Sequence, residues 1–369
     1  MSSTSLNMPV LSVEKAITTL SESYCKVVEK DLPMKILPSV MLWGPPGVGK
    51  SQAVRQIAKI IESQTGKKVS VTDVRLLLFN PIDLRGIPTA NADKTLAIWL
   101  KPQIFQMSDS EDVINILFLD EISAAPQSVQ AAAYQITLDR VVGEHKLPEN
   151  CIVIAAGNRV TDKSVSFKMP KALANRLLHI EIEGSFDSWL NWAMKAGINE
   201  KVIGYLSYRT DRLFGFDAKT DDLAFATPRS WEMVSNLLNN VSDNVAKIYP
   251  LIAGLVGNGT AYEFRSWCKM TNLPKVEDIF IGKEKKLPET SDALYAVVAS
   301  MVSYARDCKY DLEKIGNSLS YACNMPADYV AFLLKNYETF AEDYKNTLLQ
   351  IPEYLTISGK NGVVRNGSV

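Results

Sequence analysis

The chain has 369 residues, of which 47% are hydrophobic and 22% are charged. This composition is typical of a globular protein with a substantial core, and the length is enough for two domains or more. The 40 basic and 41 acidic residues give a net charge of −1, which excludes a general electrostatic attraction to nucleic acid or to an anionic membrane.

The cysteines and the first residues indicate a cytoplasmic protein. The five cysteines lie far apart, and no two have the spacing of a zinc-ligand pair, so we expect reduced thiols rather than a zinc site or a disulfide framework. The opening stretch MSSTSLNMPV lacks the basic and then apolar pattern of a signal peptide. No apolar run is long enough to span a membrane.

The first half of the chain alternates between helical and strand patterns. Apolar residues at helical spacing predict helices over 11–29, 51–63 and 128–138. Short apolar runs predict strands over 40–43, 68–74, 114–119, 151–156 and 178–182. Mostly apolar strands separated by helices are typical of a parallel sheet that is covered by helices on both faces.

After about Gly184 the strand patterns nearly disappear. The segments with helical spacing are 185–195, 230–249, 260–270 and 293–308. The second half is therefore expected to be all-helical, with a polar tail that begins at Ser358.

The densest cluster of glycine and proline lies in VMLWGPPGVGKSQAVRQIAK, residues 40–59. Its central part fits the pattern GxxxxGK[ST], in which backbone N–H groups and the start of a helix surround phosphate. Lys50 would reach the β- and γ-phosphates, and Ser51 would ligate Mg²⁺. The alternative is a tight turn with an incidental Lys-Ser pair, which the flanking strand and helix argue against. The predicted nucleotide-binding residues are Gly44, Pro45, Pro46, Gly47, Val48, Gly49, Lys50, Ser51 and Gln52.

The run ILFLDE places two carboxylates at the end of a buried strand. The first, Asp120, would join Ser51 in holding the metal ion, because strand ends of a parallel sheet meet at one edge. The second, Glu121, would orient and deprotonate the attacking water, a role that favours hydrolysis over transfer to a small molecule. The alternative is an acidic pair that caps the next helix.

Three further polar residues are candidates for the same site. Asn158 follows the strand over 151–156 and could bind the γ-phosphate or the lytic water, although Gly-Asn pairs also form ordinary turns. Arg176 could act on a neighbouring active site, or be a surface residue near a helix end. Arg229 follows a helix start at Thr227-Pro228, where a cation is disfavoured unless a phosphate lies nearby. The predicted catalytic residues are Glu121, Asn158, Arg176 and Arg229.

In this order, the segments over about residues 10–275 resemble the motifs of AAA+ ATPases. GPPGVGKS is similar to Walker A, ILFLDE to Walker B, AAGN to the sensor 1 segment, ANR to the arginine-finger segment and TPRS to sensor 2. The segments 80–88, 138–144 and 254–264 further resemble the MoxR branch of this family.

The resemblance implies an α/β P-loop NTPase with a parallel sheet core and helices on both faces. It divides the chain into an AAA+ nucleotide-binding domain over 1–184, an all-helical lid over 185–275 and a helical C-terminal extension and tail over 276–369. It implies an ATPase that uses ATP and Mg²⁺ and forms a homo-oligomeric ring, usually a hexamer. MoxR-like proteins commonly act as chaperones on a protein substrate with a von Willebrand factor A partner.

Two hairpins are also expected in the first domain. The resemblance implies one after the second strand, which GIPTANADKTLAIW at 86–99 would suit, with Ile98 and Trp99 as contact residues or as core residues. A second is expected at 141–147 with Gly143 at its turn. His145 and His179 are the only histidines; neither has a metal-ligand spacing, and we interpret them as a hairpin residue and a strand residue.

Two alternatives to a protein remodeller remain. A nucleic-acid motor or loader is disfavoured by the near-zero net charge and the short basic runs at 67–68 and 283–286. A non-catalytic scaffold, in which ATP binding alone sets assembly, is disfavoured by the intact Asp120-Glu121 pair.

Overall fold

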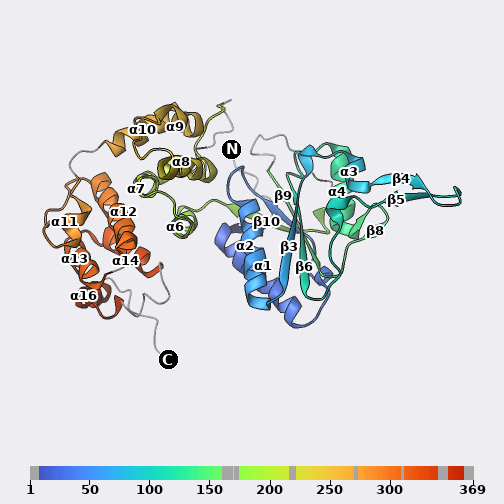
Figure 1. Cartoon of the computed structure of the whole chain (residues 1–369), viewed down its shortest axis with the longest axis horizontal. Helices are drawn as coiled ribbons and strands as arrows, with labels where there is room; N and C mark the ends of the chain where they lie inside the picture. The colour runs from blue at the N-terminus through green and yellow to red at the C-terminus, as the bar shows by residue number, and fades with distance from the viewer. Residues whose placement is uncertain are drawn as a thin grey trace. The chain divides into compact units, whose positions relative to one another are not determined.

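The computed structural model describes residues 8–159, 169, 174–215, 222–269, 273–308, 311–339 and 348–360. The chain divides into two compact units, Met1–Ser185 and Phe186–Val369, which are drawn together in Figure 1 and are described separately below. The division of the helical half into 185–275 and 276–369 stays a prediction.

The first unit contains a six-stranded, all-parallel sheet with the strand order β1-β10-β2-β9-β6-β3. This confirms the predicted α/β fold class, and each predicted strand is present to within about two residues. The strands are β1 Val10–Ser12, β2 Val40–Trp43, β3 Lys68–Arg75, β6 Val113–Asp120, β9 Cys151–Gly157 and β10 Leu178–Glu183.

The predicted helix over 11–29 is wrong at its first two residues. Leu11 and Ser12 belong to β1, where Leu11 pairs with Ile182 of β10, and α1 spans Val13–Glu29. Pairing with a distant strand thus overrides the local helical spacing. The Ser12 side chain accepts a hydrogen bond from the N–H of Lys15 at 3.2 Å, which fixes the start of α1.

Each face of the sheet has its own apolar core because side chains alternate along a strand. Val40 and Leu42 of β2 pack with α1 and with α2, Lys50–Thr65, on one face. Met41 packs with α4, Gln127–Asp139, on the other face. The two layers hold the carboxyl ends of β2, β6 and β9 at one edge of the sheet.

Both predicted hairpins are confirmed. Strands β4, Ile87–Ala90, and β5, Ala97–Leu100, pair antiparallel, and the hairpin that they form projects from the unit in Figure 1. The shorter β7, Val141–Val142, and β8, His145–Lys146, flank Gly143, whose φ of +60° suits glycine. A hydrogen bond of 2.8 Å joins His145 Nε2 to the carbonyl of Trp99 and ties the two hairpins together. Short helical segments in this unit are η1 Met34–Ile36, η2 Leu76–Leu78, α3 Pro81–Arg85 and η3 Gln103–Phe105.

The described part of the second unit is built of helices. One apolar cluster is centred on Trp231 and Phe264, and another on Leu333 and Tyr337. The helices are α6 Phe186–Lys195, α7 Glu200–Tyr208, η5 Thr210–Arg212, α8 Pro228–Asn240, α9 Tyr249–Val256, α10 Asn258–Cys268, α11 Val276–Phe280, α12 Ser291–Asp307, α13 Leu312–Ala322, α14 Ala327–Thr339 and α16 Pro352–Lys360. None of the described helices is long and apolar enough to cross a bilayer.

The helix predicted over 230–249 is interrupted. It ends as α8 at Asn240, and α9 begins only at Tyr249. Between them the side chain of Asn244 accepts hydrogen bonds from the backbone of Ala246 and Lys247 at 3.0 and 3.3 Å. This local side-chain bonding competes with the helix and explains the break. Residue 270, at the end of the predicted helix over 260–270, lies outside the described residues.

We predict that Gly86→Ala will disrupt the β4–β5 hairpin. Gly86 has φ +90°, and a Cβ there would lie 1.9 Å from the carbonyl oxygen of Leu100. The substitution should lower the free energy of unfolding by about 3 kcal/mol and expose the hairpin to proteolysis. Urea unfolding and limited proteolysis measure both effects.

Gly66→Ala is the matched control, since Gly66 also has a positive φ of +69° but no atom within 4 Å of the added Cβ. It should cost only about 1 kcal/mol of left-handed strain. Equal effects of the two substitutions would show that the contact with Leu100 is unimportant.

Candidate active site

The loop between β2 and α2 has the backbone of a phosphate-binding turn. Gly47 and Gly49 have φ values of +76° and +106°, which favour glycine. A Cβ on Gly44 would lie 2.7 Å from the carbonyl oxygen of Ile182 in β10, so a side chain cannot fit there. No side chain caps the start of α2, which leaves its first N–H groups and positive dipole end to an anion.

The buried ammonium of Lys50 joins this loop to the end of β9. Its Nζ donates hydrogen bonds to the carbonyls of Gly44 and Pro45 at 2.6 and 3.0 Å. It also donates to Oδ1 of Asn158 at 3.0 Å. The structure thus brings together two residues that sequence reasoning had selected separately, because β2 and β9 are neighbours in the sheet.

Ser51 and Asp120 meet at the start of α2. Ser51 Oγ donates to Oδ2 of Asp120 at 2.8 Å, while Oδ1 of Asp120 accepts from the N–H of Glu121 at 2.8 Å. A hydroxyl and a carboxylate are oxygen ligands that suit Mg²⁺, which usually keeps several waters and binds substrate phosphates. Among the described residues, no group of three or more His, Cys, Asp or Glu residues could hold a metal ion.

Glu121 has an unusual backbone and an unsatisfied carboxylate. Its φ is +59°, a left-handed value that is uncommon for a residue other than glycine. Its Oε2 is buried and has no hydrogen-bond partner among the described residues. Strained backbone and an unpaired buried oxygen both cost free energy and are concentrated at functional sites. The residues present therefore fit a site that places a water or a nucleotide beside Glu121.

Ser123 and Gly157 are site residues that sequence reasoning missed. The backbone N–H of Asn158 donates to Oγ of Ser123 at 2.9 Å, which fixes the backbone position of Asn158. A Cβ on Gly157 would lie 2.9 Å from the same oxygen, so only glycine allows this approach. The sequence offers no signal for this contact because it joins the ends of two different strands.

The two candidate arginines lie in different units. Arg176 is exposed on the turn before β10, and Arg229 is exposed in the first turn of α8. Neither forms a hydrogen bond or an ion pair with another residue in the described ranges. The predicted cap at Thr227 is confirmed, since its side chain accepts from the N–H of Ser230 at 3.1 Å. Residues 171–173, which begin the segment ahead of Arg176, lie outside the described residues.

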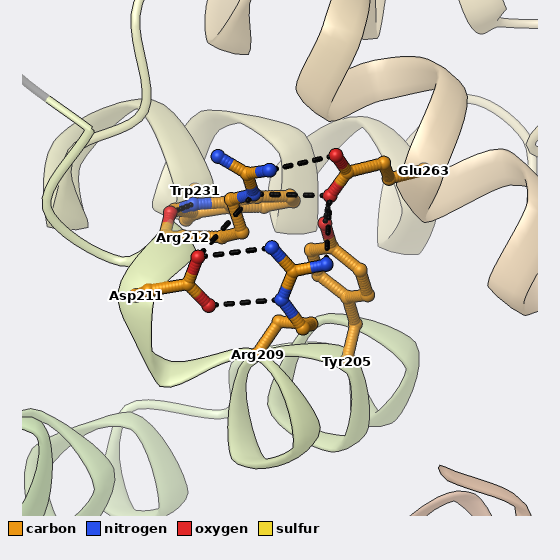
Figure 2. A network of polar contacts seen from close by, with 6 residues as sticks. All are labelled: Tyr205, Arg209, Asp211, Arg212, Trp231 and Glu263. Carbon is orange, nitrogen blue, oxygen red and sulfur yellow. Dashed lines mark hydrogen bonds and ion pairs between the residues drawn. The ribbon is translucent and has the colours of Figure 1, made fainter.

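A polar network holds the start of α8 in the second unit (Figure 2). The indole Nε1 of the buried Trp231 donates to the carbonyl of Arg212 at 2.8 Å. The Arg212 guanidinium forms a bidentate pair with Glu263 of α10, with N–O distances of 2.7 and 3.0 Å. Figure 2 shows Arg209 beside this pair, bonded to Asp211 at 2.9 Å through two nitrogens.

The charged groups of this network shift the pKa values of Asp211 and Tyr205. Hydrogen bonds from Arg209 hold the pKa of the Asp211 carboxyl below its usual value. Burial, together with the nearby Glu263 carboxylate, raises the pKa of Tyr205, whose hydroxyl donates to Glu263 at 3.2 Å. The hydrogen bond from Trp231 to the carbonyl of Arg212 fixes the turn over 209–212 to α8, and Trp231 lies two residues after Arg229.

Comparison with known proteins gives a family match within the first unit. The family model described as "ATPase family associated with various cellular activities (AAA)" matches residues 39–179, which is less than half of the chain. These residues contain Lys50, Asp120, Glu121, Asn158 and Arg176. Together with the parallel sheet, the match indicates a P-loop nucleotide-binding module of the AAA+ ATPase type in the first unit. No curated protein sequence matches the chain.

Solved structures with a similar chain include PCH-2 of C. elegans, with 12% identity, a TM-score of 0.35 and coverage of 69% of this chain and 67% of that chain. A RuvB mutant of Thermotoga maritima has 15% identity, a TM-score of 0.35 and coverage of 78% and 81%. NtrX of Brucella abortus has 13% identity, a TM-score of 0.36 and coverage of 91% and 69%. Similarity at these sequence identities and TM-scores supports no conclusion about function.

We predict that Glu263→Gln will destabilise the second unit. The change removes the carboxylate that both Arg209 and Arg212 pair with, while part of the hydrogen bonding survives. Because the side chain is about a third exposed, the free energy of unfolding should fall by only about 1–2 kcal/mol. Urea unfolding followed by tryptophan fluorescence measures the loss.

Glu232→Gln on the exposed side of α8 is the control and should leave the midpoint unchanged. A Glu263→Gln midpoint equal to that of the control would mean that the network contributes nothing to stability.

Proposed function

We propose that the chain is an ATP-hydrolysing, MoxR-like AAA+ protein that works as a homo-oligomeric ring on a protein substrate. The observation that carries the proposal is the arrangement at one edge of the sheet. There Lys50 and Ser51 of the phosphate loop are bonded to Asn158 and Asp120, and the carboxylate of Glu121 stays unpaired beside them. This set contains the residue types that ATP binding and hydrolysis need.

Each side chain has a separate part in the proposed hydrolysis. Lys50 would exchange its contacts with backbone carbonyls for the β- and γ-phosphate oxygens. Ser51 and Asp120 would hold the magnesium ion, which offsets phosphate charge when bound. Glu121 would take a proton from the attacking water, since its free carboxylate oxygen faces no other hydrogen-bond partner. Asn158, held by Ser123, would orient the γ-phosphate or that water.

Assembly into a ring would complete the site. The exposed side chain of Arg176 has no partner among the described residues and would be available to the active site of a neighbouring subunit. Arg229 would contribute from the helical unit, where Thr227 and Trp231 fix the helix that carries it. A hexamer, the usual MoxR state, is the proposed size.

The β4–β5 hairpin supports a protein substrate. Ile87, Leu96 and Leu100 are each more than half exposed on it, and Ile98 is 42% exposed. Exposed apolar groups of this size on a projecting hairpin suit contact with another polypeptide. Trp99 is partly buried, and its carbonyl is bonded to His145, so Ile98 is the better contact candidate. A von Willebrand factor A partner is proposed on the resemblance of 80–88, 138–144 and 254–264 to the MoxR branch.

We predict that Glu121→Gln will bind ATP with nearly unchanged affinity and lose hydrolysis. The amide keeps the shape of the side chain but cannot accept the proton of the attacking water, so turnover should fall by about 10²-fold or more. Calorimetry measures binding, and a steady-state phosphate assay measures turnover.

Lys50→Ala provides the contrast, since it removes the buried cation and should weaken binding itself. Continued hydrolysis by Glu121→Gln would exclude Glu121 as the base, and unaltered affinity of Lys50→Ala would count against the phosphate site.

We predict that Arg176→Ala will reduce turnover only where the protein is assembled. The guanidinium would stabilise transition-state charge in a neighbouring subunit, and removing it should lower kcat by about 10²-fold or more with little change in nucleotide affinity. The assay is ATP hydrolysis as a function of protein concentration, alongside the oligomeric state by light scattering.

The control is Arg55→Ala, an exposed arginine on α2 that pairs with Asp73 at 3.5 Å. If Arg176→Ala turns over ATP like this control at assembled concentrations, the finger assignment is wrong.

A further inference from the structure

The imidazole of His179 forms one hydrogen bond through each ring nitrogen. Nδ1 lies 2.9 Å from Nε1 of Trp43, and Nε2 lies 2.7 Å from the carbonyl oxygen of Ala174. An indole nitrogen can only donate, and a carbonyl oxygen can only accept. His179 Nδ1 must therefore accept while Nε2–H donates, so the two partners fix a neutral ring in one tautomer.

The two partners of His179 belong to different parts of the proposed active site. Trp43 is the last residue of β2 and directly precedes Gly44 of the phosphate loop. Ala174 lies two residues before Arg176, in a turn that the N–H of Leu177 closes by donating to the same carbonyl at 3.2 Å. One side chain of β10 thus joins the start of the phosphate loop to the turn that carries Arg176.

Two neighbouring contacts support this bridge, by which His179 joins Trp43 to Ala174. The ring planes of Trp43 and His179 are nearly parallel, at 19°, with centroids 6.1 Å apart, which suits a hydrogen bond in the plane of both rings. Glu181, two residues along and hence on the same face of β10, pairs with Arg159, the residue after Asn158. This face of β10 therefore contacts the chain next to both Gly44 and Asn158.

We propose that His179 is a positioning residue that holds the Arg176 turn in a fixed relation to the phosphate loop. The proposal rests on the role of Arg176 in the proposed function. The hydrogen bonds of His179 among the described residues are to Trp43 and Ala174, and His179 acts through these two residues. A structural strand residue would need only shape and apolar packing at this position, whereas the bridge needs an acceptor and a donor at opposite ends of one side chain.

Substitution of His179 by glutamine and by leucine distinguishes a hydrogen-bonding bridge from a residue that only fills space in the strand. The amide of His179→Gln offers an oxygen that can accept from Trp43 and an NH₂ that can donate to Ala174. His179→Leu fills similar space and keeps neither bond. His145→Gln is the matched control, because His145 is the other histidine and is bonded to Trp99 instead.

The first measurements do not depend on activity. In ¹⁵N-histidine NMR of the full chain, with the two signals assigned by the glutamine variants, His179 should show the neutral Nε2–H tautomer. In hydrogen exchange, the amides over 174–179 should exchange faster in His179→Leu than in wild type, His179→Gln or His145→Gln. An Nδ1–H tautomer, or equal exchange in all four proteins, would overturn the bridge.

The second measurement is kinetic and uses a double-mutant cycle. His179→Leu should lower kcat at assembled concentrations by about tenfold or more with ATP affinity within about twofold, since small displacements of a catalytic group are costly. His179→Gln should restore most of this loss. In the Arg176→Ala background His179→Leu should have no further effect, because both changes remove the same contribution.

The outcomes distinguish the inference from the proposed function. A full additional loss in the Arg176→Ala background would overturn the positioning role while leaving Arg176 in place. An Arg176→Ala protein with wild-type turnover would overturn the finger assignment, and with it the kinetic role of His179. The NMR and exchange results would then still decide whether His179 ties the turn to β2.

Discussion

The buried ammonium of Lys50 is the interaction on which the candidate site depends. It donates to two carbonyls of the phosphate loop and to the side chain of Asn158, so one cation holds together a loop after β2 and the end of β9. A buried cation is tolerated only when acceptors surround it. Here these acceptors are the groups that would release it to the phosphates of a nucleotide.

Parallel pairing explains why so many polar groups meet at one edge. The carboxyl ends of β2, β6, β9 and β10 lie together, and each is followed by a polar or glycine-containing turn. Ser51 lies in the first turn of α2, which follows the loop after β2. Asp120 ends β6 and Glu121 follows it, while Asn158 follows β9. At this edge Glu121 has a left-handed φ, and the side chain of Ser123 packs against the backbone of Gly157 so closely that a Cβ there would lie 2.9 Å from its Oγ.

In the helical unit the polar groups described above connect helices to one another. Its polar network joins residues of the same unit. Hydrogen bonds among Arg212, Glu263 and Trp231 link η5, α10 and α8, and the side chains of Arg212 and Glu263 are only about a third exposed to water. Such a network orients one helix start rather than forming a site of its own. The hydrogen bond from Trp231 to Arg212 holds the first turns of α8, the helix on which Arg229 is exposed.

The sequence by itself determined the local elements and the chemistry that they carry. The phosphate loop, the Asp120-Glu121 pair and the strands follow from spacing and residue type within a few neighbouring positions, whereas the hairpin at 86–99 is expected from the family resemblance. Local patterns failed where distant pairing or side-chain bonding prevailed, as at Leu11 in β1 and Asn244 in the break after α8.

Only the tertiary structure decided which of these residues meet. Lys50 and Asn158 lie 108 positions apart, and Trp43 and His179 lie 136 apart, yet each pair is joined by a hydrogen bond. The sequence identified His179 as a strand residue, which is correct, but its two partners depend on β10 lying beside β2. Strand order is set by the packing of the whole sheet, and no periodicity within a single strand encodes it.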